Sequence, residues 1–417
     1  MNKEIKQGYK QTKVGIIPED WEVVKVGEKF DFLKTYSNSR EDLNNVDEIS
    51  YIHYGEIHTK HKFYIDFGKF ELPKINKSKL PNEIIFAQNG DLVIADASED
   101  YADIGKSAEI KNLTSKAVSG LHTFLLRDNN NNFANGYKGY LFYNETVAKS
   151  IKKIATGISV LGISKTNLSK LEIPLPPLKE QEKIADILTI WDEAITKQTE
   201  LLEAKELQKK GLMQKLLSGE VRFSGFSDEW EDIRLGKYIK EISKKNKENI
   251  DLVLSVTNKH GFIAQKDYFD KEVASKNTSN YKIVKRGNFA YNPSRINVGS
   301  LGLLEEYEIG ILSPMYVIFE CLKGLNKEYL NYWLNTHNFT GNLYKFLSGS
   351  VRDSLAFNDM KLMKIKLPVL KEQEKIVEVL SLVDKEIDLL KKELEELKLQ
   401  KKAVMQKLLT GQVRVKV

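Results

Sequence analysis

The sequence LPPLKEQEKIADIL, which begins at Leu175, returns as LPVLKEQEKIVEVL at Leu367, 192 residues further along the chain. The alignment of the two copies continues without a gap over 49 positions, of which 26 are identical. Both copies end alike, with MQKLLSGEVR at 213–222 and MQKLLTGQVR at 405–414. Identity of this extent at a fixed offset indicates an internal duplication.

The duplication extends upstream of the repeated segments. Gly157 and Gly349 keep the same offset of 192 residues. Near the front of each copy, Trp21 and Trp230 are each followed six residues later by a glycine, but their offset is 209. The second copy is therefore 17 residues shorter in its interior. The two copies share their ends and differ in between.

Both repeated segments are expected to be long helices. In the second copy, apolar residues recur at steps of four and three from Ile376 to Leu408, which is a coiled-coil seam of more than four heptads. Pro368 precedes this helix and Gly411 follows it, as start and stop signals do. Some seam positions are polar, and such residues either fix the register or face solvent or another subunit. They are Lys401 in the second copy and Gln198, Lys205 and Lys209 in the first.

The two helices are expected to pack against each other. Each spans about 40 residues, or roughly 60 Å, which is too long for its apolar stripe to be buried by one small domain. The spacing alone leaves both directions of pairing open. The sequence thus divides into a first variable domain at 1–174, a central helix at 175–219, a second variable domain at 220–366 and a C-terminal helix at 367–417.

The variable domains are predicted to be mixed α/β. Short β-like runs at 91–95, 122–127, 288–292 and 315–320 alternate with Gly, Asn and Asp turns. A helical pattern at 327–339 follows the last of them. We assign no strand order from the sequence.

Composition narrows the class of protein. A chain of 417 residues with 41% apolar and 29% charged residues is typical of a soluble protein of two or more domains. It has no apolar run long enough to span a bilayer, no apolar stretch near Met1 that would act as a secretory signal, and one cysteine, Cys321. These features predict a cytoplasmic protein. The net charge of +6 is spread over the chain, so any nucleic-acid footprint must be a local patch.

No catalytic or metal-binding motif is convincing. Gly157 and Gly162 have the spacing of a phosphate-binding loop, but Ile163 stands where a lysine is needed. Glu109 and Lys111 match the end of a common nuclease motif, a pattern that arises by chance in a chain rich in Lys and Glu. Three nearby histidines lack a second ligand cluster, namely His53, His58 and His61. We predict no catalytic residue and no metal ligand.

Several loops have residues suited to DNA contact. Backbone amides and hydroxyls in glycine-containing loops can donate hydrogen bonds to phosphate oxygens. Asn can form two hydrogen bonds with adenine, and Arg can form two with guanine. A solvated loop is the alternative for each of them. The candidate DNA-binding residues are Tyr36, Asn38, Arg40, His53, Tyr101, Thr156, Gly157, Ser159, Lys245, Asn258, Lys259, Asn292, Ser294, Arg295, Ser348, Gly349, Ser350 and Arg352.

The whole chain resembles the specificity subunit of type I restriction–modification enzymes. The residues that carry the resemblance are IPLPPLKEQEKIADIL at 173–188, IKLPVLKEQEKIVEVL at 365–380, the two MQKLL(S/T)G(E/Q)VR endings, and the Trp-x5-Gly motifs at Trp21 and Trp230. The resemblance implies two mixed α/β target-recognition domains, each reading one half of a split DNA sequence. It also implies that the two helices pair antiparallel, give the molecule a pseudo-two-fold repeat and act as a spacer.

The resemblance further implies partners and places the chemistry in them. The expected partners are double-stranded DNA, two methyltransferase subunits and endonuclease/translocase subunits. The methyltransferase would use S-adenosylmethionine and the endonuclease ATP and Mg, so no cofactor is expected in this chain. The expected function is therefore a non-catalytic, sequence-specific DNA-binding subunit.

Three other interpretations remain open at this point. The chain could be a coiled-coil adaptor that joins two proteins without DNA, or a subunit of a related DNA-defence complex. It could also be a stand-alone nuclease with a degenerate site. Salt-dependent, sequence-selective binding of duplex DNA separates the first from a specificity subunit.

Overall fold

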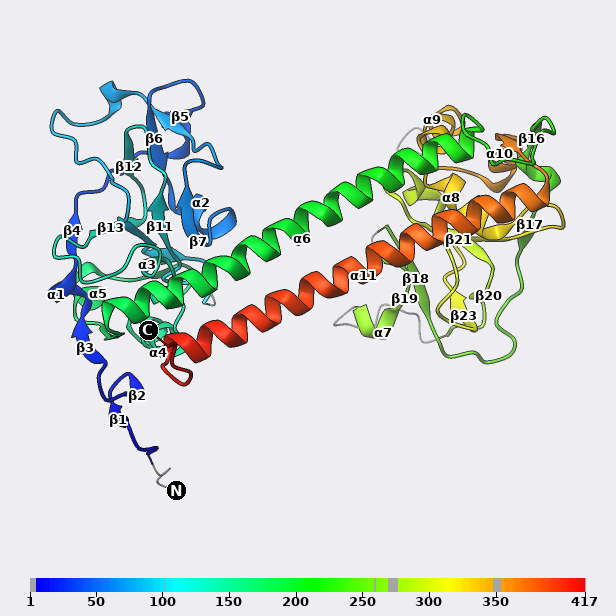
Figure 1. Cartoon of the computed structure of the whole chain (residues 1–417). Coiled ribbons are helices and arrows are strands. Elements are labelled where there is room, and N and C mark those ends of the chain that lie inside the picture. Colours follow the sequence, from blue (N-terminus) through cyan, green and yellow to red (C-terminus); the bar gives the residue numbers. More distant parts are fainter. Residues whose placement is uncertain (1–4, 102, 259, 269–276, 348–353, 417) are drawn as a thin grey trace. The chain divides into compact units, whose positions relative to one another are not determined.

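The computed structural model describes residues 5–101, 103–258, 260–268, 277–347 and 354–416. The chain forms two compact units. The first unit contains Met1–Thr199 and Glu393–Val417, and the second contains Glu200–Lys392. Each unit holds one variable domain and a part of each long helix (Figure 1). The division into four sequence segments remains a prediction.

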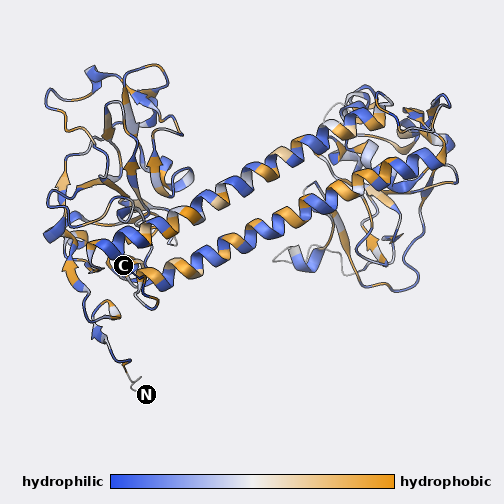
Figure 2. Cartoon of the chain, viewed as in Figure 1, coloured by the Kyte–Doolittle hydropathy of each residue, from blue (hydrophilic) through white to orange (hydrophobic). Residues whose placement is uncertain are grey.

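The repeated segments form the helices α6 (Leu178–Ser218) and α11 (Leu370–Leu409). Hydrophilic and hydrophobic residues alternate along the whole length of both helices (Figure 2). A glycine with a left-handed backbone follows the end of each helix, Gly219 at φ +76° one residue after α6 and Gly411 at φ +69° two residues after α11. Glycine adopts this conformation without the steric cost that a Cβ brings, so Gly411 acts as the predicted stop signal and Gly219 does the same in the first copy.

The helices pair antiparallel within each unit. In the first unit Asp192 pairs with Lys401 and Gln198 with Glu393, so residue numbers rise along one helix as they fall along the other. In the second unit Lys205 pairs with Glu386, Lys209 with Asp384 and Glu206 with Lys391. The helices thus pair antiparallel, which settles the direction that the spacing left open. The four polar seam residues contact the facing helix.

The first variable domain contains two main sheets. One has the order β4-β13-β9-β11-β7, and the other the order β12-β6-β8-β5. Their bounds are β4 Asp31–Leu33, β5 Leu43–Asn44, β6 Ile49–Ile52, β7 Phe63–Asp66, β8 Lys74–Ile75, β9 Leu92–Ala95, β11 Ser107–Lys111, β12 Ala117–Ser119 and β13 Thr123–Arg127. The remaining strands are β1 Tyr9–Thr12 with β2 Gly15–Pro18, and β10 Ala97–Ser98 with β14 Leu161–Gly162. The short helices are α1 Val26–Lys29, α2 Tyr54–Thr59, α3 Lys138–Leu141, α4 Glu145–Ile154 and α5 Lys165–Ser169.

The second variable domain has a different sheet pattern. Its largest sheet has the order β17-β24-β21-β22, beside the pairs β18-β19 and β20-β23. The bounds are β17 Ile239–Ile242, β18 Leu254–Thr257, β19 Gly261–Ala264, β20 Lys282–Lys285, β21 Phe289–Tyr291, β22 Leu301–Leu303, β23 Ile309–Leu312 and β24 Val317–Cys321. The helices are α7 Gln265–Tyr268, α8 Lys327–Leu334, α9 His337–Phe346 and α10 Phe357–Leu362. Both domains are mixed α/β, as predicted.

One helix prediction is wrong in detail. The pattern at 327–339 is not a single helix, because α8 ends at Leu334 and α9 begins at His337. Thr336 starts the second helix by accepting a hydrogen bond from the Phe339 backbone N–H on its hydroxyl, at 3.3 Å. A capping threonine of this kind satisfies a helix N–H that otherwise has no partner.

The shared ends of the two copies form the same structure in both units. The strand after Trp21, β3 (Glu22–Lys25), pairs antiparallel with β15 (Glu172–Leu175), which leads into α6. The strand after Trp230, β16 (Glu231–Arg234), pairs in the same way with β25 (Lys364–Leu367), which leads into α11. Since each strand pair joins the two ends of a variable domain, it sets that domain on the start of its helix.

The glycines of the two Trp-x5-Gly motifs are required by close packing. A Cβ at Gly27 would lie 2.9 Å from the Ser169 Cβ, and one at Gly236 would lie 2.8 Å from the Lys361 Cβ.

No helix among the described residues is long and apolar enough to cross a membrane.

Candidate nucleic-acid interface

A buried glutamate at the start of each long helix binds a tryptophan and an arginine from the shared ends of the two copies. In the second unit the Glu372 carboxylate is fully buried and accepts hydrogen bonds from Arg222 Nε at 2.9 Å and Arg222 Nη2 at 2.8 Å. The indole of Trp230 donates to the same carboxylate at 3.1 Å. The repeated Glu, Trp and Arg thus form one structural clamp.

The first unit contains the equivalent clamp. Glu180 accepts from Arg414 Nε at 2.8 Å and Nη2 at 2.9 Å, and from the Trp21 indole at 2.8 Å. In both units the arginine that follows one long helix therefore contacts the glutamate that begins the other. A bidentate Arg–carboxylate pair fixes orientation as well as distance, so the clamp defines where each variable domain meets the helices.

A second repeated contact attaches each variable domain to the helix pair. The Tyr140 hydroxyl of α3 donates to Asp192 Oδ2 at 2.5 Å, and the Tyr332 hydroxyl of α8 donates to Asp384 Oδ2 at 2.6 Å. In each unit the same aspartate also pairs with a lysine of the facing helix. These lysines are Lys401 and Lys209.

The surroundings of Lys401 are unusually apolar for a lysine. Its side chain is 6% exposed, and its ammonium lies 3.8 Å from the centre of the Phe63 ring. Burial lowers the pKa of Lys401 to about 8, against the opposing attraction of Asp192. A charge held under these conditions costs free energy, so its presence at this seam position favours one register over others.

The second unit brings four candidate DNA-binding residues to one cavity. A cavity of about 900 Å³ is lined by Asn258, Asn292, Ser294 and Arg295, together with apolar side chains that include the exposed Met315. These residues come from the end of β18, from the loop after β21 and from the loop before β24. In the sequence Asn292, Ser294 and Arg295 belong to one stretch and Asn258 to another, and the fold brings the two stretches to one cavity.

The cavity combines fixed and free polar groups. The Asn292 side chain caps the 3₁₀ turn Pro293–Val298 by accepting from the Ser294 backbone N–H at 3.1 Å, while its Nδ2 donates to Met315 Sδ at 3.5 Å. The Arg295 side chain is exposed and makes no hydrogen bond or ion pair within the described part of the chain, whereas its backbone bonds within the turn. A free guanidinium beside an amide and an exposed apolar side chain suits the edges of base pairs, which offer acceptors, donors and the thymine methyl group.

Lys245 is not among the residues that line this cavity. It is exposed, and its ammonium donates to Asn280 Oδ1 at 3.1 Å. Five predicted residues lie outside the described ranges, and their roles stay predictions. They are Lys259, Ser348, Gly349, Ser350 and Arg352.

Two of the first-unit candidates are core residues. Tyr36 is 5% exposed, and its hydroxyl accepts a hydrogen bond from the Ile85 backbone N–H at 2.7 Å. His53 is 6% exposed, and its Nδ1 accepts from the Gly55 backbone N–H at 3.1 Å, where it caps α2. Burial also lowers the pKa of His53. Neither side chain offers an open face to a base, so both are explained by packing.

Two further candidates are partly engaged in the fold. The Asn38 amide donates to the Lys79 carbonyl at 3.2 Å. The Arg40 guanidinium is 61% exposed and pairs at 2.8 Å with Glu56, whose carboxylate is fully buried. Arg40 thus keeps an exposed surface that a phosphate can reach, while its position is fixed by the buried partner.

Four first-unit candidates are exposed in one region. Thr156, Gly157 and Ser159 lie in the loop between α4 and β14, and Tyr101 follows β10, the strand with which β14 pairs. The Tyr101 hydroxyl donates to the Lys152 carbonyl at 2.8 Å, which ties Tyr101 to the end of α4. The loop prediction therefore corresponds to an exposed surface.

One polar cavity of the first unit contains none of the residues that the sequence singled out. It has a volume of about 370 Å³, and two lysines, Lys77 and Lys116, line it together with two carboxylates, Asp47 and Glu48, so its charge is balanced. Asn76 caps the following turn by accepting from the Ser78 backbone N–H at 3.0 Å. The signal was present in KINKSK at 74–79, where three lysines alternate with small and polar residues.

The residues that could suggest catalysis have structural roles instead. Glu109 is 1% exposed and accepts from the backbone N–H groups of Gly136 at 2.8 Å and Gly139 at 3.0 Å. Burial raises the pKa of the Cys321 thiol to about 12, which keeps it protonated and unreactive. No group of three potential metal ligands occurs among the residues that the structure describes.

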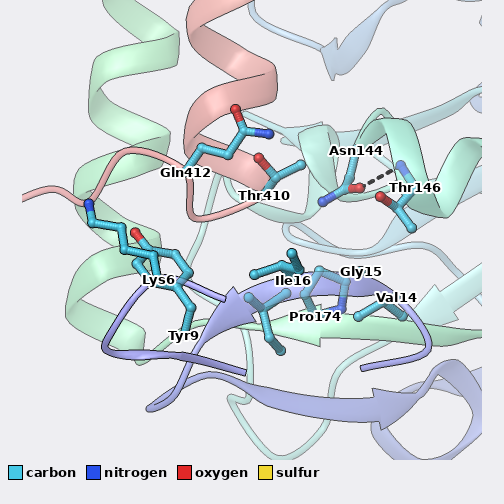
Figure 3. A pocket seen from close by; sticks show the side chains of 11 residues that line it. Lys6, Tyr9, Val14, Gly15, Ile16, Asn144, Thr146, Pro174, Thr410 and Gln412 are labelled. Carbon is cyan, nitrogen blue, oxygen red and sulfur yellow. Dashed lines mark hydrogen bonds between the residues drawn. The ribbon is translucent and has the colours of Figure 1, made fainter. Parts of the chain in front are cut away.

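A further cavity of about 430 Å³ lies in the first unit beside the chain ends (Figure 3). It is bounded by the β1–β2 hairpin, the start of α4 and the turn after α11, and Lys6 is the one charged residue among the described residues that line it. The Tyr9 hydroxyl closes one side by donating to the Gly411 carbonyl at 2.9 Å. The described lining is mainly apolar with one lysine, and no acid–base pair for catalysis occurs among these residues.

Comparison with known proteins identifies the family. The family described as type I restriction modification DNA specificity domain matches the chain twice, over residues 18–206 and 228–399. The chain belongs to this family. The type I restriction enzyme MjaVIII specificity subunit of Methanocaldococcus jannaschii is 29% identical over 430 residues, which cover 96% of this chain and 94% of that subunit.

Solved structures of the family share the fold. The S subunit of a type I restriction–modification system from M. genitalium superposes with a TM-score of 0.52 at 15% identity, covering 93% of this chain and 96% of that one. A chain from a study of complex assembly and conformational transition of the type I R-M system gives 0.54 at 17% identity, covering 95% and 99%. Family membership makes this chain a DNA specificity subunit, with a role in recognition rather than catalysis.

Proposed function

We propose that each unit of this specificity subunit reads one half of a bipartite DNA target. We further propose that the paired helices set the gap between the half-sites and dock two methyltransferase subunits, which endonuclease/translocase subunits join, in the cytoplasm. The cavity that gathers Asn258, Asn292 and Arg295 carries the DNA part of the proposal. It presents base-reading side chain types on one surface of the second unit.

The difference between the two variable domains supports a target with unlike halves. The first contains a five-stranded and a four-stranded sheet, and the second a four-stranded sheet with two separate strand pairs. The clamps and tyrosine contacts that attach them to the helices are nevertheless the same. Two different variable domains attached in the same way suit a DNA sequence whose two halves differ, just as two identical DNA-binding domains suit a palindromic site.

The exposed surface of the helices supports the docking of two identical partners. Exposed positions near the two ends of α6 are mostly identical in α11, such as Leu178 with Leu370 and Leu207 with Leu399. Among the exposed positions of α6 from 193 to 206, Glu203 is the one that is identical in α11. Packing within the protein does not require identical residues at exposed positions. The identity of exposed residues near the helix ends therefore supports two equivalent contact surfaces for identical partners.

The proposal is tested with the chain purified together with its methyltransferase subunits. The modified adenines are mapped across a host genome, and duplexes carrying the deduced sequence are compared with scrambled duplexes at several salt concentrations. We expect a bipartite motif and binding of that motif roughly 10³-fold or more tighter than of scrambled DNA. A complex that binds duplexes with salt dependence but no sequence preference would contradict the proposal.

A further inference from the structure

The loop between α4 (Glu145–Ile154) and β14 (Leu161–Gly162) forms a narrow, well-anchored tip. The backbone groups of Thr156 and Gly162 bond to each other in both directions, at 2.9 and 2.7 Å. Gly157 has a φ of +131°, and a Cβ there would lie 2.0 Å from the Val160 carbonyl oxygen. Because glycine alone allows this close return of the chain, residues 158 and 159 are held at the apex.

The apex carries an apolar side chain in full contact with solvent. Ile158 is 101% exposed and Val160 is 54% exposed. Single exposed apolar residues are common on protein surfaces. Ile158 differs in that it stands at the end of an anchored tip, within the loop that was predicted to contact DNA.

The duplication separates this residue from the protein-docking positions. Leu178, Ile190 and Leu207 are exposed apolar residues of α6, and the equivalent positions of α11 also carry exposed apolar residues, Leu370, Leu382 and Leu399. The position equivalent to Ile158 is Ser350 in the second copy. A surface shared by two identical partners would be repeated, whereas a residue that serves one half-site need not be. The lack of repetition thus favours DNA as the occupant.

The surroundings of the tip also suit a duplex. Lys153 is exposed at the end of α4, and the Lys152 ammonium lies 5.6 Å from the centre of the exposed Tyr101 ring. Glu99 and Asp100 follow β10 nearby, so the surface is not uniformly basic. Attraction to phosphates therefore does not by itself explain the tip, and its apolar apex needs a separate role.

We propose that Ile158 inserts as a wedge between two adjacent base pairs of the half-site read by the first unit. Proteins that deform DNA use apolar side chains of this size to unstack a base step, while nearby lysines and hydroxyls contact the backbone. The wedge rests on the proposed function, since it requires that the first unit bind one half-site. It makes the two half-sites unequal, because the second copy has serine at the equivalent position.

The test uses the complex of the full chain with its methyltransferase subunits and a duplex carrying its mapped target. A fluorescent 2-aminopurine is placed in turn at each position of both half-sites, and its fluorescence reports loss of stacking. We expect the wild-type complex to raise the fluorescence several-fold at one step of one half-site. Ile158→Ser should abolish this rise and weaken target binding roughly tenfold.

Val46→Ser is the matched control, because Val46 is 89% exposed in the same unit but lies outside the tip. It should leave fluorescence and affinity unchanged. Equal fluorescence in wild type and Ile158→Ser, with equal affinity, would overturn the wedge. So would a loss of methyltransferase subunits from the Ile158→Ser complex, which would make the tip a protein contact.

Two further outcomes are distinguishable. If binding depends on Ile158 without a fluorescence change, and falls when one thymine is replaced by uracil, the residue contacts a thymine methyl group and does not insert. If the wild-type complex has no preferred sequence at all, the proposed function itself fails, whatever the variants do.

Discussion

At the scale of single residues, Lys401 gives the seam a dependence on pH. Its pKa of about 8 lies below the value of 10.5 for an unperturbed lysine. Between these two values the unfolded chain holds more protons at this site than the folded chain, so the contribution of Lys401 to stability rises with pH. We expect Lys401→Met to remove this rise from the free energy of unfolding measured by urea titration between pH 8 and 10.5.

The control for this measurement is Lys398→Met, one turn earlier on the same helix. Lys398 is 48% exposed and pairs with the exposed Glu395, so its charge is not subject to the same burial. It should leave the pH profile of the wild type intact. The same slope in the Lys401→Met profile would show that burial of this ammonium does not shift its titration.

Arg295 is the residue through which base reading by the second unit is best tested. If its free guanidinium makes a bidentate contact with guanine, Arg295→Ala should weaken binding of the target by about 1–3 kcal/mol. The loss should be confined to sequences that keep the guanine, and the first half-site should be read as before. Competition binding with single-base variants of each half-site measures both effects.

Arg286→Ala supplies the comparison within the same unit. Arg286 is also exposed, but it pairs with Glu308 at 2.9 Å and does not line the cavity. Its removal should leave base preference unchanged. An equal loss across unrelated sequences with Arg295→Ala would instead identify a phosphate contact, which carries no sequence information.

The sequence separated framework residues from surface residues only in part. The repeat identified Glu180, Trp21 and Arg414 as shared, but their joint clamp depends on chain segments that are far apart. Conversely, Tyr36 and His53 have the residue types of DNA readers and are buried by their domain. Residue type indicates which bonds a side chain can make, and burial, which depends on tertiary packing, decides whether it makes them within the protein.

At the scale of elements, the helices could be predicted and the sheets could not. The seam of α11 repeats over many turns, so its pattern determines both extent and buried face. The strands have two to five residues each and pair across long stretches of chain, as β4 (Asp31–Leu33) does with β13 (Thr123–Arg127). Local pattern does not encode such pairing, although the runs at 91–95 and 122–127 coincide with β9 and β13.

The helix surface leads to a prediction about partner number. Ile190 and Leu399 each lie two residues before a member of the Asp192–Lys401 pair, and are 64% and 65% exposed. Leu382 and Leu207 have the same relation to the Asp384–Lys209 pair in the second unit. We expect Ile190→Glu and Leu382→Glu each to lose one methyltransferase subunit, and the double variant to lose both, because each charge blocks burial of one apolar contact. Native mass spectrometry counts the subunits.

Leu201→Glu is the control for this prediction. Leu201 is 44% exposed on the same helix, but the equivalent position in the second copy is already a glutamate, Glu393. This variant should retain both methyltransferase subunits. A full complement in the Ile190→Glu, Leu382→Glu double variant would place the docking surfaces elsewhere.

At the scale of the whole molecule, the helices are continuous while the compact units are two. Each of α6 and α11 begins in one unit and ends in the other, with the boundary after Thr199 and before Glu393. Any change of length made at this boundary in both helices leaves the contacts inside each unit intact. The proposed spacer role can therefore be tested without altering either reader.

We expect three heptads inserted at the boundary in both helices to lengthen the gap of the recognised DNA sequence by about nine base pairs. The 21 added residues extend an α-helix by about 31 Å, and base pairs rise by about 3.4 Å. Whole heptads keep the apolar seam in phase. An extension close to one turn of B-DNA, about 10 base pairs, also returns the second half-site to nearly the same face of the duplex.

A single heptad in each helix is the informative companion to this variant. It adds about 10 Å, or about three base pairs, and so presents the second half-site about a third of a turn away from its original face. It should bind its best duplex more weakly than the three-heptad variant binds its own. Mapping of methylated adenines reads the gap in each case, and an unchanged gap in the three-heptad variant would exclude the helices as the element that measures the DNA.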